Sequence, residues 1–338
     1  MHRIAHRSVS GDDSALSLMR ALITGINGFV GGHLAEYLLQ IGGWEVWGID
    51  RSSSLNLASL HGQVRIIQAD LSDAAATAQA LRTVRPEVIF HLAGQAAVPE
   101  SFRDPAATLA TNTLGALHIF LALIAEQIAA RVVVVGTSEE YGQIRAADLP
   151  LREDAPLRPT SPYGVSKVAQ SMLALQYHLS HQLDLVRVRP FTHIGPRQTD
   201  RFVTAAFARQ IARIELGHQE PIMRVGNLSA ARDFTDVRDI VRGYVLLAQH
   251  GQAGEVYNLG SGRAIMIRDI LDQFRAQSQI QIAVETDPNL MRPVDIPLIT
   301  CDARKLHAAT GWQPHYSIET TLTDILNSWR EHERTNHA

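Results

Sequence analysis

The 338-residue sequence predicts an α/β protein with a doubly wound parallel sheet and a smaller, partly interleaved α/β part toward the C-terminus. The first observation is that short, almost continuously apolar runs such as 131–135 alternate with amphipathic segments of helical period. A strand needs such a run when helices cover both faces of its sheet. The second is a composition with 46% hydrophobic residues, which is ample for a large core.

The predicted elements follow from these patterns in chain order. Strands are expected at 20–23, 45–49, 64–69, 87–94, 131–135 and 183–189, and helices at 30–41, 74–84, 105–127 and 162–181. The pattern is less regular beyond residue 190. Helices are expected there at 200–216, 236–249, 267–277 and 318–332, with short strands at 222–225 and 255–259. We therefore predict a loose tail at 1–18, a first domain at 19–190 and a second, interleaved domain at 191–338.

A glycine-rich turn links the first strand to the first helix. Gly25, Gly28 and Gly31 let a backbone turn tightly and approach a pyrophosphate, which would sit on the helix N-terminus. Asp50 ends the second strand about 20 residues further on, where an acidic residue can bind the adenosine ribose of NAD. Arg51 favours a 2′-phosphate instead, so NADH and NADPH both stay open. The whole unit predicts a Rossmann-type dinucleotide site.

Candidate site residues gather where predicted strands end. Ligands of such sheets lie beyond the carboxyl ends of the strands, and this edge holds Gly25, Asp50, Asp70, Ala93 and Thr137. His91, near the end of the fourth strand, is interpreted as a packed histidine rather than a catalyst.

A Tyr and a Lys stand four residues apart just inside a predicted helix. Ser161 suits the cap and Pro162 the first position, and Tyr163 and Lys167 then share one face. A neighbouring cation favours the phenolate and brings a Tyr into the range of acid–base work. Most such pairs are surface neighbours, so the pair depends on its context.

Composition excludes several classes of protein. A formal charge of −3 argues against general nucleic-acid binding. The single cysteine, Cys301, allows no internal disulfide and fits a reducing, cytoplasmic compartment. Histidines are numerous but lack metal-site spacing, so no metal is expected. No signal-peptide run precedes Met19, which is a possible start, and we expect no membrane-length apolar segment.

Six motifs in this order resemble the extended short-chain dehydrogenase/reductase superfamily, in its nucleotide-sugar branch. They are Thr24-Gly25-x-x-Gly28-x-x-Gly31, Asp70-Leu71, His91-Leu92-Ala93, Asn112, Thr137-Ser138 and Tyr163-x-x-x-Lys167. The resemblance covers residues 20–332. Later segments look like those of GDP-sugar enzymes, namely 161–167, 191–196, 202–204, 225–228, 232–239 and 292–293.

Residues 193–196, His-Ile-Gly-Pro, resemble GDP-4-dehydro-6-deoxy-D-mannose reductases more than the sister GDP-mannose 4,6-dehydratases. Thr192 stands where both usually carry Asn. The resemblance implies NAD(P)H-dependent reduction of the C4 keto group to GDP-D-rhamnose, or to its C4 epimer GDP-6-deoxy-D-talose. Alternatives are a 4,6-dehydratase with Glu139 as base, a sugar-nucleotide 4-epimerase and, remotely, a non-catalytic dinucleotide-sensing protein.

The resemblance also assigns roles to residues. Tyr163 is expected to protonate the C4 oxygen, Lys167 to hold the nicotinamide ribose and lower the pKa of Tyr163, and Thr137 to bond the same oxygen. Glu140 is interpreted as a solvated loop carboxylate. The implied cofactor contacts are Gly25, Asn27, Gly28, Phe29, Val30, Gly31, Asp50, Arg51, Asp70, Leu71, Leu92, Ala93, Tyr163, Lys167 and His193. The implied GDP-sugar contacts are Thr192, Val203, Asn227, Arg232 and Arg292, with Arg197 and Arg224 as weaker candidates.

Relatives in this branch dimerise through two long helices that form a four-helix bundle. This implies a homodimer through the helices at 105–127 and 162–181. The apolar residues available for it are Leu114, Leu117, Phe120, Leu121, Ile124, Met172, Leu173 and Leu175. The same residues would serve equally to cover the sheet.

Overall fold

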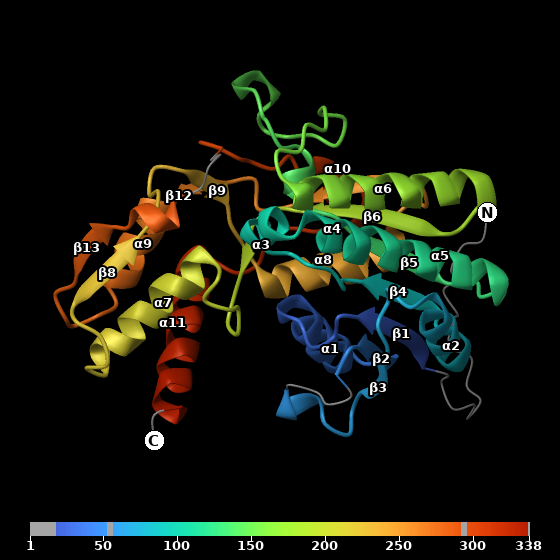
Figure 1. Cartoon of the computed structure of the whole chain (residues 1–338), viewed down its shortest axis with the longest axis horizontal. Coiled ribbons are helices and arrows are strands. Elements are labelled where there is room, and N and C mark those ends of the chain that lie inside the picture. Colours follow the sequence, from blue (N-terminus) through green and yellow to red (C-terminus); the bar gives the residue numbers. More distant parts are fainter. Residues whose placement is uncertain (1–17, 53–56, 292–295, 337–338) are drawn as a thin grey trace.

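A seven-stranded parallel sheet forms the centre of the molecule (Figure 1), in the order β3-β2-β1-β4-β5-β6-β11. The computed structural model describes residues 18–52, 57–291 and 296–336, so all but the last residue of the predicted tail lies outside the described residues. The strands are β1 Met19–Thr24, β2 Trp44–Asp50, β3 Arg65–Gln68, β4 Val88–His91, β5 Arg131–Val135, β6 Leu185–Pro190 and β11 Val256–Leu259. The predicted doubly wound fold is confirmed.

Helices cover both faces of this sheet because side chains alternate along each strand. On β1, Ile23 joins the core under α1 (Phe29–Ile41) and α8 (Val237–His250). Its neighbour Leu22 joins the opposite core. That core lies under α2 (Ala74–Val84), α5 (Gly115–Ala125) and α6 (Pro162–His181).

The C-terminal part of the chain completes the large sheet. β11 pairs in parallel with β6, with Tyr257 opposite Val188. The helix before it, α8, packs on α1. The predicted short strand at 255–259 is therefore an edge of the main sheet, which fits the expected interleaving of the two parts.

The smaller part has its own core between α7 (Val203–Glu215), α9 (Ile267–Arg275) and α11 (Ile318–Thr335). Three two-stranded ladders accompany it: β7 His193–Ile194 with β10 Thr235–Asp236, β8 Ile222–Val225 with β13 Ala283–Thr286, and antiparallel β9 Ala231–Asp233 with β12 Ala264–Met266. The remaining α-helices are α3 Val98–Arg103, α4 Pro105–Leu109 and α10 Arg304–Thr310.

The helix predicted at 105–127 is not one regular α-helix. A π-helical turn, Ala110–Leu114, separates α4 from α5. The buried Asn112 side chain lies in this turn. It accepts from the Gln95 backbone N–H (2.8 Å) and donates to the Gln95 carbonyl (3.0 Å) and to Ser166 Oγ (2.8 Å). Such turns are often found where a side chain is placed for function.

The expectation of no membrane-length apolar segment is wrong. The 21 residues Pro105–Ala125 contain an 18-residue window with a mean hydropathy of 1.6 and are, by length and composition, apolar enough to span a bilayer. Yet 44% of this window is buried inside the protein, and α5 packs against α2 and α6. Length and composition alone do not separate a core helix from a spanning one.

Candidate active site

The glycine turn at the start of α1 is closed so tightly that side chains do not fit. Gly25 has φ +73° and an ideal Cβ there would lie 3.0 Å from Ala93 Cα. An ideal Cβ on Gly31 would lie 2.3 Å from the Gly25 carbonyl oxygen. The residue types at these two positions are thus dictated by the turn.

The first turn of α1 suits a pyrophosphate. Gly28 caps the helix without a side-chain hydrogen bond, and no acidic residue occupies the first turn. Backbone N–H groups and the positive end of the helix dipole therefore face outward together. Phe29 and Val30 are the first residues of this turn, and Phe29 stacks on His193 at 6.2 Å between ring centroids.

Asp50 and Arg51, the two residues predicted to distinguish NAD from NADP, lie beside that turn. The half-buried Asp50 carboxylate accepts from the backbone N–H groups of Asn27 and Ser52, both at 3.3 Å. Arg51 is exposed next to it. The structure thus leaves both the ribose-binding and the 2′-phosphate-binding interpretation in place.

Other predicted cofactor contacts line the same edge of the sheet. The Asp70 carboxylate accepts from the Ser72 N–H and hydroxyl, which lower the pKa of Asp70, and Leu71 is buried after it. Ala93 donates to Thr24 Oγ1, and Leu92 packs against the core under α1.

His91 is confirmed as a packed histidine. It is buried, and its Nδ1 lies 2.9 Å from Thr24 Oγ1. Burial and, to a lesser degree, Lys167 lower the pKa of His91 to about 3. The imidazole is therefore neutral at physiological pH.

The Tyr163 hydroxyl meets the Thr137 side chain at the carboxyl end of β5. Ser161 Oγ accepts from the Gly164 N–H at 3.0 Å and Pro162 opens α6, as predicted. Burial raises the pKa of the Tyr163 phenol; the hydrogen bond with Thr137 opposes this rise, and Glu139 and Glu140 add to it. The net shift is upward, opposite to the expected lowering by Lys167, because burial is the largest effect and Lys167 is not among the groups that shift the pKa of Tyr163.

Lys167 is buried one turn after Tyr163 on α6. Its Nζ donates to the Val135 carbonyl at 3.0 Å and to Gln170 Oε1 at 2.9 Å. Burial lowers the pKa of Lys167 to about 8, and the Glu140 carboxylate opposes this shift. Both members of the predicted Tyr–Lys pair are therefore buried in the protein interior.

The interpretation of Glu140 as a solvated carboxylate is wrong. Its side chain is fully buried, accepts from the Thr137 N–H at 3.0 Å, and pairs with Arg189 Nε at 2.8 Å. Burial raises the pKa of Glu140, and the Arg189 guanidinium opposes that rise. The partner lies 49 residues further along the chain, on β6, where no local pattern reveals it. Glu139, next to it, is half-buried, and its N–H donates to Thr137 Oγ1.

The predicted sugar-nucleotide contacts lie in the smaller part and in the segment leading to it. Thr192 directly precedes β7, and its carbonyl accepts from the Thr235 N–H. His193, a predicted cofactor contact, donates from its Nδ1–H to the Phe191 carbonyl (2.9 Å), and burial lowers the pKa of His193. Val203 opens α7, which has no side-chain cap. Asn227 Oδ1 accepts from the Ser229 N–H and hydroxyl.

The predicted phosphate-binding arginines differ in their surroundings. Arg232 Nη1 donates to the carbonyls of Ala231 (2.9 Å) and Ile296 (2.6 Å). Arg292 lies outside the described residues, and Arg224 is exposed on β8. Arg197 is instead paired with Glu36 on α1 (2.6 Å), so its weak assignment to the diphosphate loses support.

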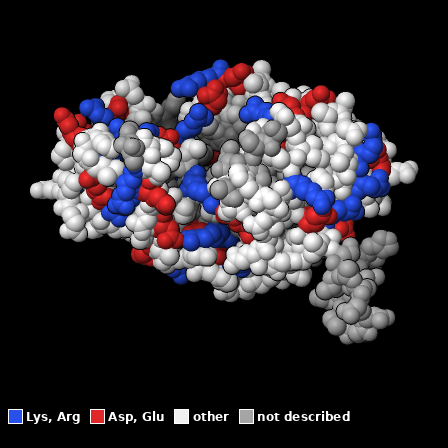
Figure 2. Space-filling model, turned by 90° about the horizontal axis from the view of Figure 1, so that it is seen from below, with Lys and Arg blue, Asp and Glu red and all other residues white. Residues whose placement is uncertain are grey.

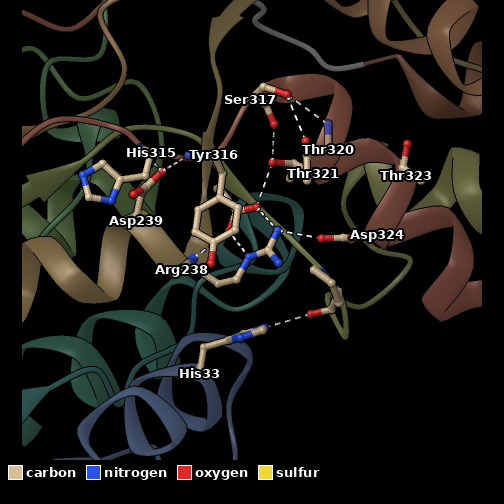
Figure 3. Close-up of polar contacts among 12 residues, drawn as sticks. His33, Arg238, Asp239, His315, Tyr316, Ser317, Thr320, Thr321, Thr323 and Asp324 are labelled. Atoms are coloured by element: carbon tan, nitrogen blue, oxygen red, sulfur yellow. Dashed lines mark hydrogen bonds and ion pairs between the residues drawn. The ribbon is translucent and has the colours of Figure 1, made fainter. Parts of the chain in front are cut away.

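Two polar junctions that the sequence did not reveal connect α1 with the segment before α7, and α8 with α11 (Figure 3). His33 Nε2 donates to the Pro196 carbonyl at 3.0 Å. On its other side, Arg197 donates to His33 Nδ1 at 3.0 Å. At the second junction, Arg238 pairs with Asp236 (2.6 Å) and Asp324 (2.8 Å) and lies 3.8 Å from the centre of the Tyr316 ring. Both junctions join residues far apart in the sequence.

The surface seen from below carries both signs of charge, with a hollow between its left and right parts and basic side chains at the edge of that hollow (Figure 2). Within the described residues, no group of three or more His, Cys, Asp or Glu side chains is placed to hold a metal ion.

The parallel sheet, the glycine turn and the Thr137–Tyr163–Lys167 cluster define a nicotinamide-dinucleotide-dependent enzyme of the short-chain dehydrogenase/reductase type. The chain belongs to the GDP-mannose 4,6 dehydratase family, whose sequence model matches residues 22–325. The resemblance inferred from the sequence is thereby confirmed.

Among curated relatives, GDP-6-deoxy-D-mannose reductase of Pseudomonas aeruginosa is 36% identical over 315 residues, covering 93% of this chain and 98% of that protein. GDP-mannose 4,6-dehydratase of Yersinia enterocolitica is 27% identical over 351 residues, covering 91% of this chain and 93% of that protein. The chain is thus similar to enzymes of both reaction types.

Solved structures agree with this placement. RMD from Pseudomonas aeruginosa complexed with NADPH has a TM-score of 0.81 and 35% identity, covering 93% of this chain and 100% of that one. UDP-glucose 4-epimerase from Thermus thermophilus in complex with NAD has a TM-score of 0.82 and 28% identity, covering 92% and 99%. The predicted dependence on NADH or NADPH is confirmed at this level.

Proposed function

We propose that this chain reduces the C4 keto group of GDP-4-dehydro-6-deoxy-D-mannose with NADPH or NADH, forming GDP-D-rhamnose or GDP-6-deoxy-D-talose. The observation that carries the proposal is the buried Tyr163 hydroxyl, which bonds the Thr137 side chain at the end of β5, on the same edge of the sheet as the glycine turn. Identity of 36% to a GDP-6-deoxy-D-mannose reductase supports the choice of substrate.

In this proposal Tyr163 is the general acid. Its raised pKa keeps the phenol protonated at neutral pH, so the hydroxyl has a proton to give. Bound NADPH or NADH supplies the hydride. Thr137 faces the same oxygen and is fixed by Glu140, whose carboxylate holds the Thr137 N–H. The Lys167 ammonium binds the nicotinamide ribose and stabilises the phenolate that remains after proton transfer.

The nucleotide end of the substrate is assigned to the smaller part. The guanidinium group of arginine can bind a phosphate through two parallel N–H bonds. We therefore assign binding of the GDP diphosphate to Arg232 and Arg292. Thr192, Val203 and Asn227 complete the proposed contacts with the GDP-sugar. The proposed division is thus 19–190 for the cofactor and 191–338 for the nucleotide sugar, with the two interleaved through β11 and α8.

A 4,6-dehydratase is the second candidate. One observation favours it. The half-buried Glu139 raises the pKa of Tyr163 electrostatically, so its carboxylate is near the phenol, where a base acting on the same substrate is expected. Such an enzyme consumes GDP-mannose without added reductant, because its cofactor is recycled.

The deciding experiment compares two incubations of the purified protein. GDP-4-dehydro-6-deoxy-D-mannose with NADPH or NADH is expected to give oxidised cofactor and a 6-deoxyhexose whose C4 configuration NMR identifies. GDP-mannose alone is expected to stay unchanged. Consumption of GDP-mannose alone, without turnover of the keto sugar, would replace the reductase by the dehydratase.

We also propose a homodimer through the exposed apolar stripes of α5 and α6. On the first helix and its π turn the stripe is Leu114, Leu121 and Ile124, and on α6 it is Val165, Met172 and Leu179, each at least 37% exposed. Four residues of the predicted set contribute little to these stripes. Phe120 is fully buried, and Leu117, Leu173 and Leu175 are half-buried.

A cytoplasmic location stays a prediction.

A further inference from the structure

The side chain of Gln170, one turn beyond Lys167 on α6, is fully buried. Its Nε2 donates to the Val135 carbonyl at 3.1 Å, and its Oε1 accepts from Lys167 Nζ at 2.9 Å. A carbonyl can only accept and an ammonium can only donate. The orientation of the Gln170 amide is therefore fixed by its two partners, with its oxygen toward the ammonium.

The ammonium is held from one side. Of its three N–H groups, one goes to the Val135 carbonyl and one to Gln170 Oε1. An ideal Cβ on Gly94 would lie 3.6 Å from Nζ, so the ammonium also faces the small residues that follow β4. That is the side on which the dinucleotide lies in the proposed function, and the third N–H remains for it.

We propose that Gln170 is a positioning residue that holds the Lys167 ammonium in place for the nicotinamide ribose. The inference rests on the proposed function. A lysine side chain is flexible along four carbons, and its charge is a compact point that can turn in many directions. The two acceptors, Gln170 Oε1 and the end of β5, remove that freedom before the cofactor binds.

The other ionisable groups that face Lys167 are few. Glu140, from the turn after β5, attracts the ammonium, and it is itself paired with Arg189. His91, on β4, is neutral because burial and then Lys167 lower its pKa. Tyr163, on α6 itself, stays protonated. Within the described part of the chain, the acceptors bonded to Nζ are Val135 O and Gln170 Oε1, and of these two only the Gln170 group can be changed by mutation.

The composition of the chain allows a direct test. It contains two lysines, Lys167 and Lys305, so protein labelled with ¹³C at lysine Cε gives two side-chain signals. A Lys305→Arg variant assigns them. Gln170→Met removes the acceptor and is expected to lower the pKa of Lys167 by about one unit, while the isosteric Gln170→Glu is expected to raise it by at least as much.

Turnover supplies the second readout. The alkaline limb of kcat/KM for NADPH is expected to move to lower pH in Gln170→Met and to higher pH in Gln170→Glu. KM for NADPH is expected to rise about tenfold in Gln170→Met, with a smaller change in kcat. Gln176→Met is the matched control, because Gln176 is exposed on the same helix and bonds Ser180. It is expected to change neither quantity.

Opposite pKa shifts in the two variants support the positioning role, since a side chain that only fills space would not produce them. An unchanged pKa of Lys167 in both variants overturns it, even if thermal stability falls. If Gln170→Met does not fold, the Glu variant alone decides by the presence or absence of the upward shift. The NMR titration needs no substrate, so the two proposals can fail separately. Shifted pKa values of Lys167 without reductase turnover would refute the proposed function but still support the positioning of Lys167 by Gln170.

Discussion

At the scale of single residues, the proposed chemistry depends on one proton held by a buried phenol. Tyr163→Phe keeps the ring and removes the hydroxyl, so we expect turnover to fall about 10²–10⁴-fold, the usual contribution of general acid catalysis. Cofactor affinity should change little. Tyr177→Phe on the same helix is the control, because Tyr177 packs against Phe120 away from the site. Steady-state kinetics with the keto sugar checks this, and near-normal turnover of Tyr163→Phe would remove the residue from its assigned role.

His33 gives the protein a predictable dependence of stability on pH. The Pro196 carbonyl requires a proton on Nε2, and the Arg197 guanidinium requires a lone pair on Nδ1, so the folded ring is neutral. Burial first, and then Arg197, lower its pKa from 6.5 to about 4. Between these values the unfolded chain binds more protons, and stability is therefore lost as the pH falls from 6.5 toward 4.

The expected size of this loss is about 3 kcal/mol at most. The wild-type protein and His33→Gln, whose amide nitrogen can still donate to Pro196, should be unfolded by urea at about pH 7 and about pH 4.5, on either side of most of this titration. The difference between the two pH values is expected to be smaller in the variant. Equal pH dependence in both proteins would show that His33 does not titrate as described.

The positions of residues were predictable from sequence where a motif fixes them locally. The Ser161–Pro162 cap and the placement of Tyr163 and Lys167 one turn apart on α6 are of this kind, because they depend only on neighbouring residues of the same helix. Glu140 and Arg197 are of the other kind. Their partners, Arg189 and Glu36, lie 49 and 161 residues away in sequence, and only the folded sheet brings them together.

At the scale of elements, the sequence predicted the helices and strands that have long periodic or continuously apolar segments, and it did not predict the short polar strands. α2 and α6 have their predicted bounds, because each begins at a capping side chain, Asp73 or Ser161, and carries a clear apolar face. β9 and β12 have three residues each, which is too short for an alternation to be recognised. The π turn before α5 depends on the bonds of Asn112 to distant backbone, which no helical periodicity encodes.

The junction of α8 and α11 supplies a stability prediction at this scale. The Asp236 side chain is fully buried, and its carboxylate is matched by Arg238 and the Thr321 hydroxyl. Arg238→Met would leave a buried carboxylate without its cation, and we expect a loss of roughly 3 kcal/mol in the free energy of unfolding. Asp324→Asn is the comparison, since this side chain is 36% exposed and its pair with Arg238 is worth less than about 1 kcal/mol. Urea unfolding of both variants measures the difference; equal small losses would mean that the buried charge is solvated or neutralised in another way.

At the scale of the whole molecule, the larger and the smaller part share elements, so the proposed cofactor and substrate regions are not separate units. β11 supplies an edge of the main sheet, and α8 covers the same face of that sheet as α1. The segment between β6 and α8 leaves this sheet to form β7 and α7 before it returns. The sequence indicated the second part by its loss of regular pattern, but the return of β11 to the sheet is set by pairing with β6, a contact between distant residues.

The remaining large feature of the surface is the pair of apolar stripes on α5 and α6. Leu121 and Met172 are 46% and 40% exposed on these two neighbouring helices, and neighbours about two turns away, such as Leu114 and Leu179, extend each stripe. A second copy that covers both stripes would bury apolar surface that a monomer leaves in water.

Leu121→Glu combined with Met172→Glu places charges at the centre of that contact, so sedimentation velocity should show a dimer for the wild type and a monomer for the variant. Ile280→Glu changes an equally exposed apolar residue elsewhere and should remain dimeric. A wild-type protein that sediments as a monomer at micromolar concentration would leave the stripes for another partner and refute the proposed dimer.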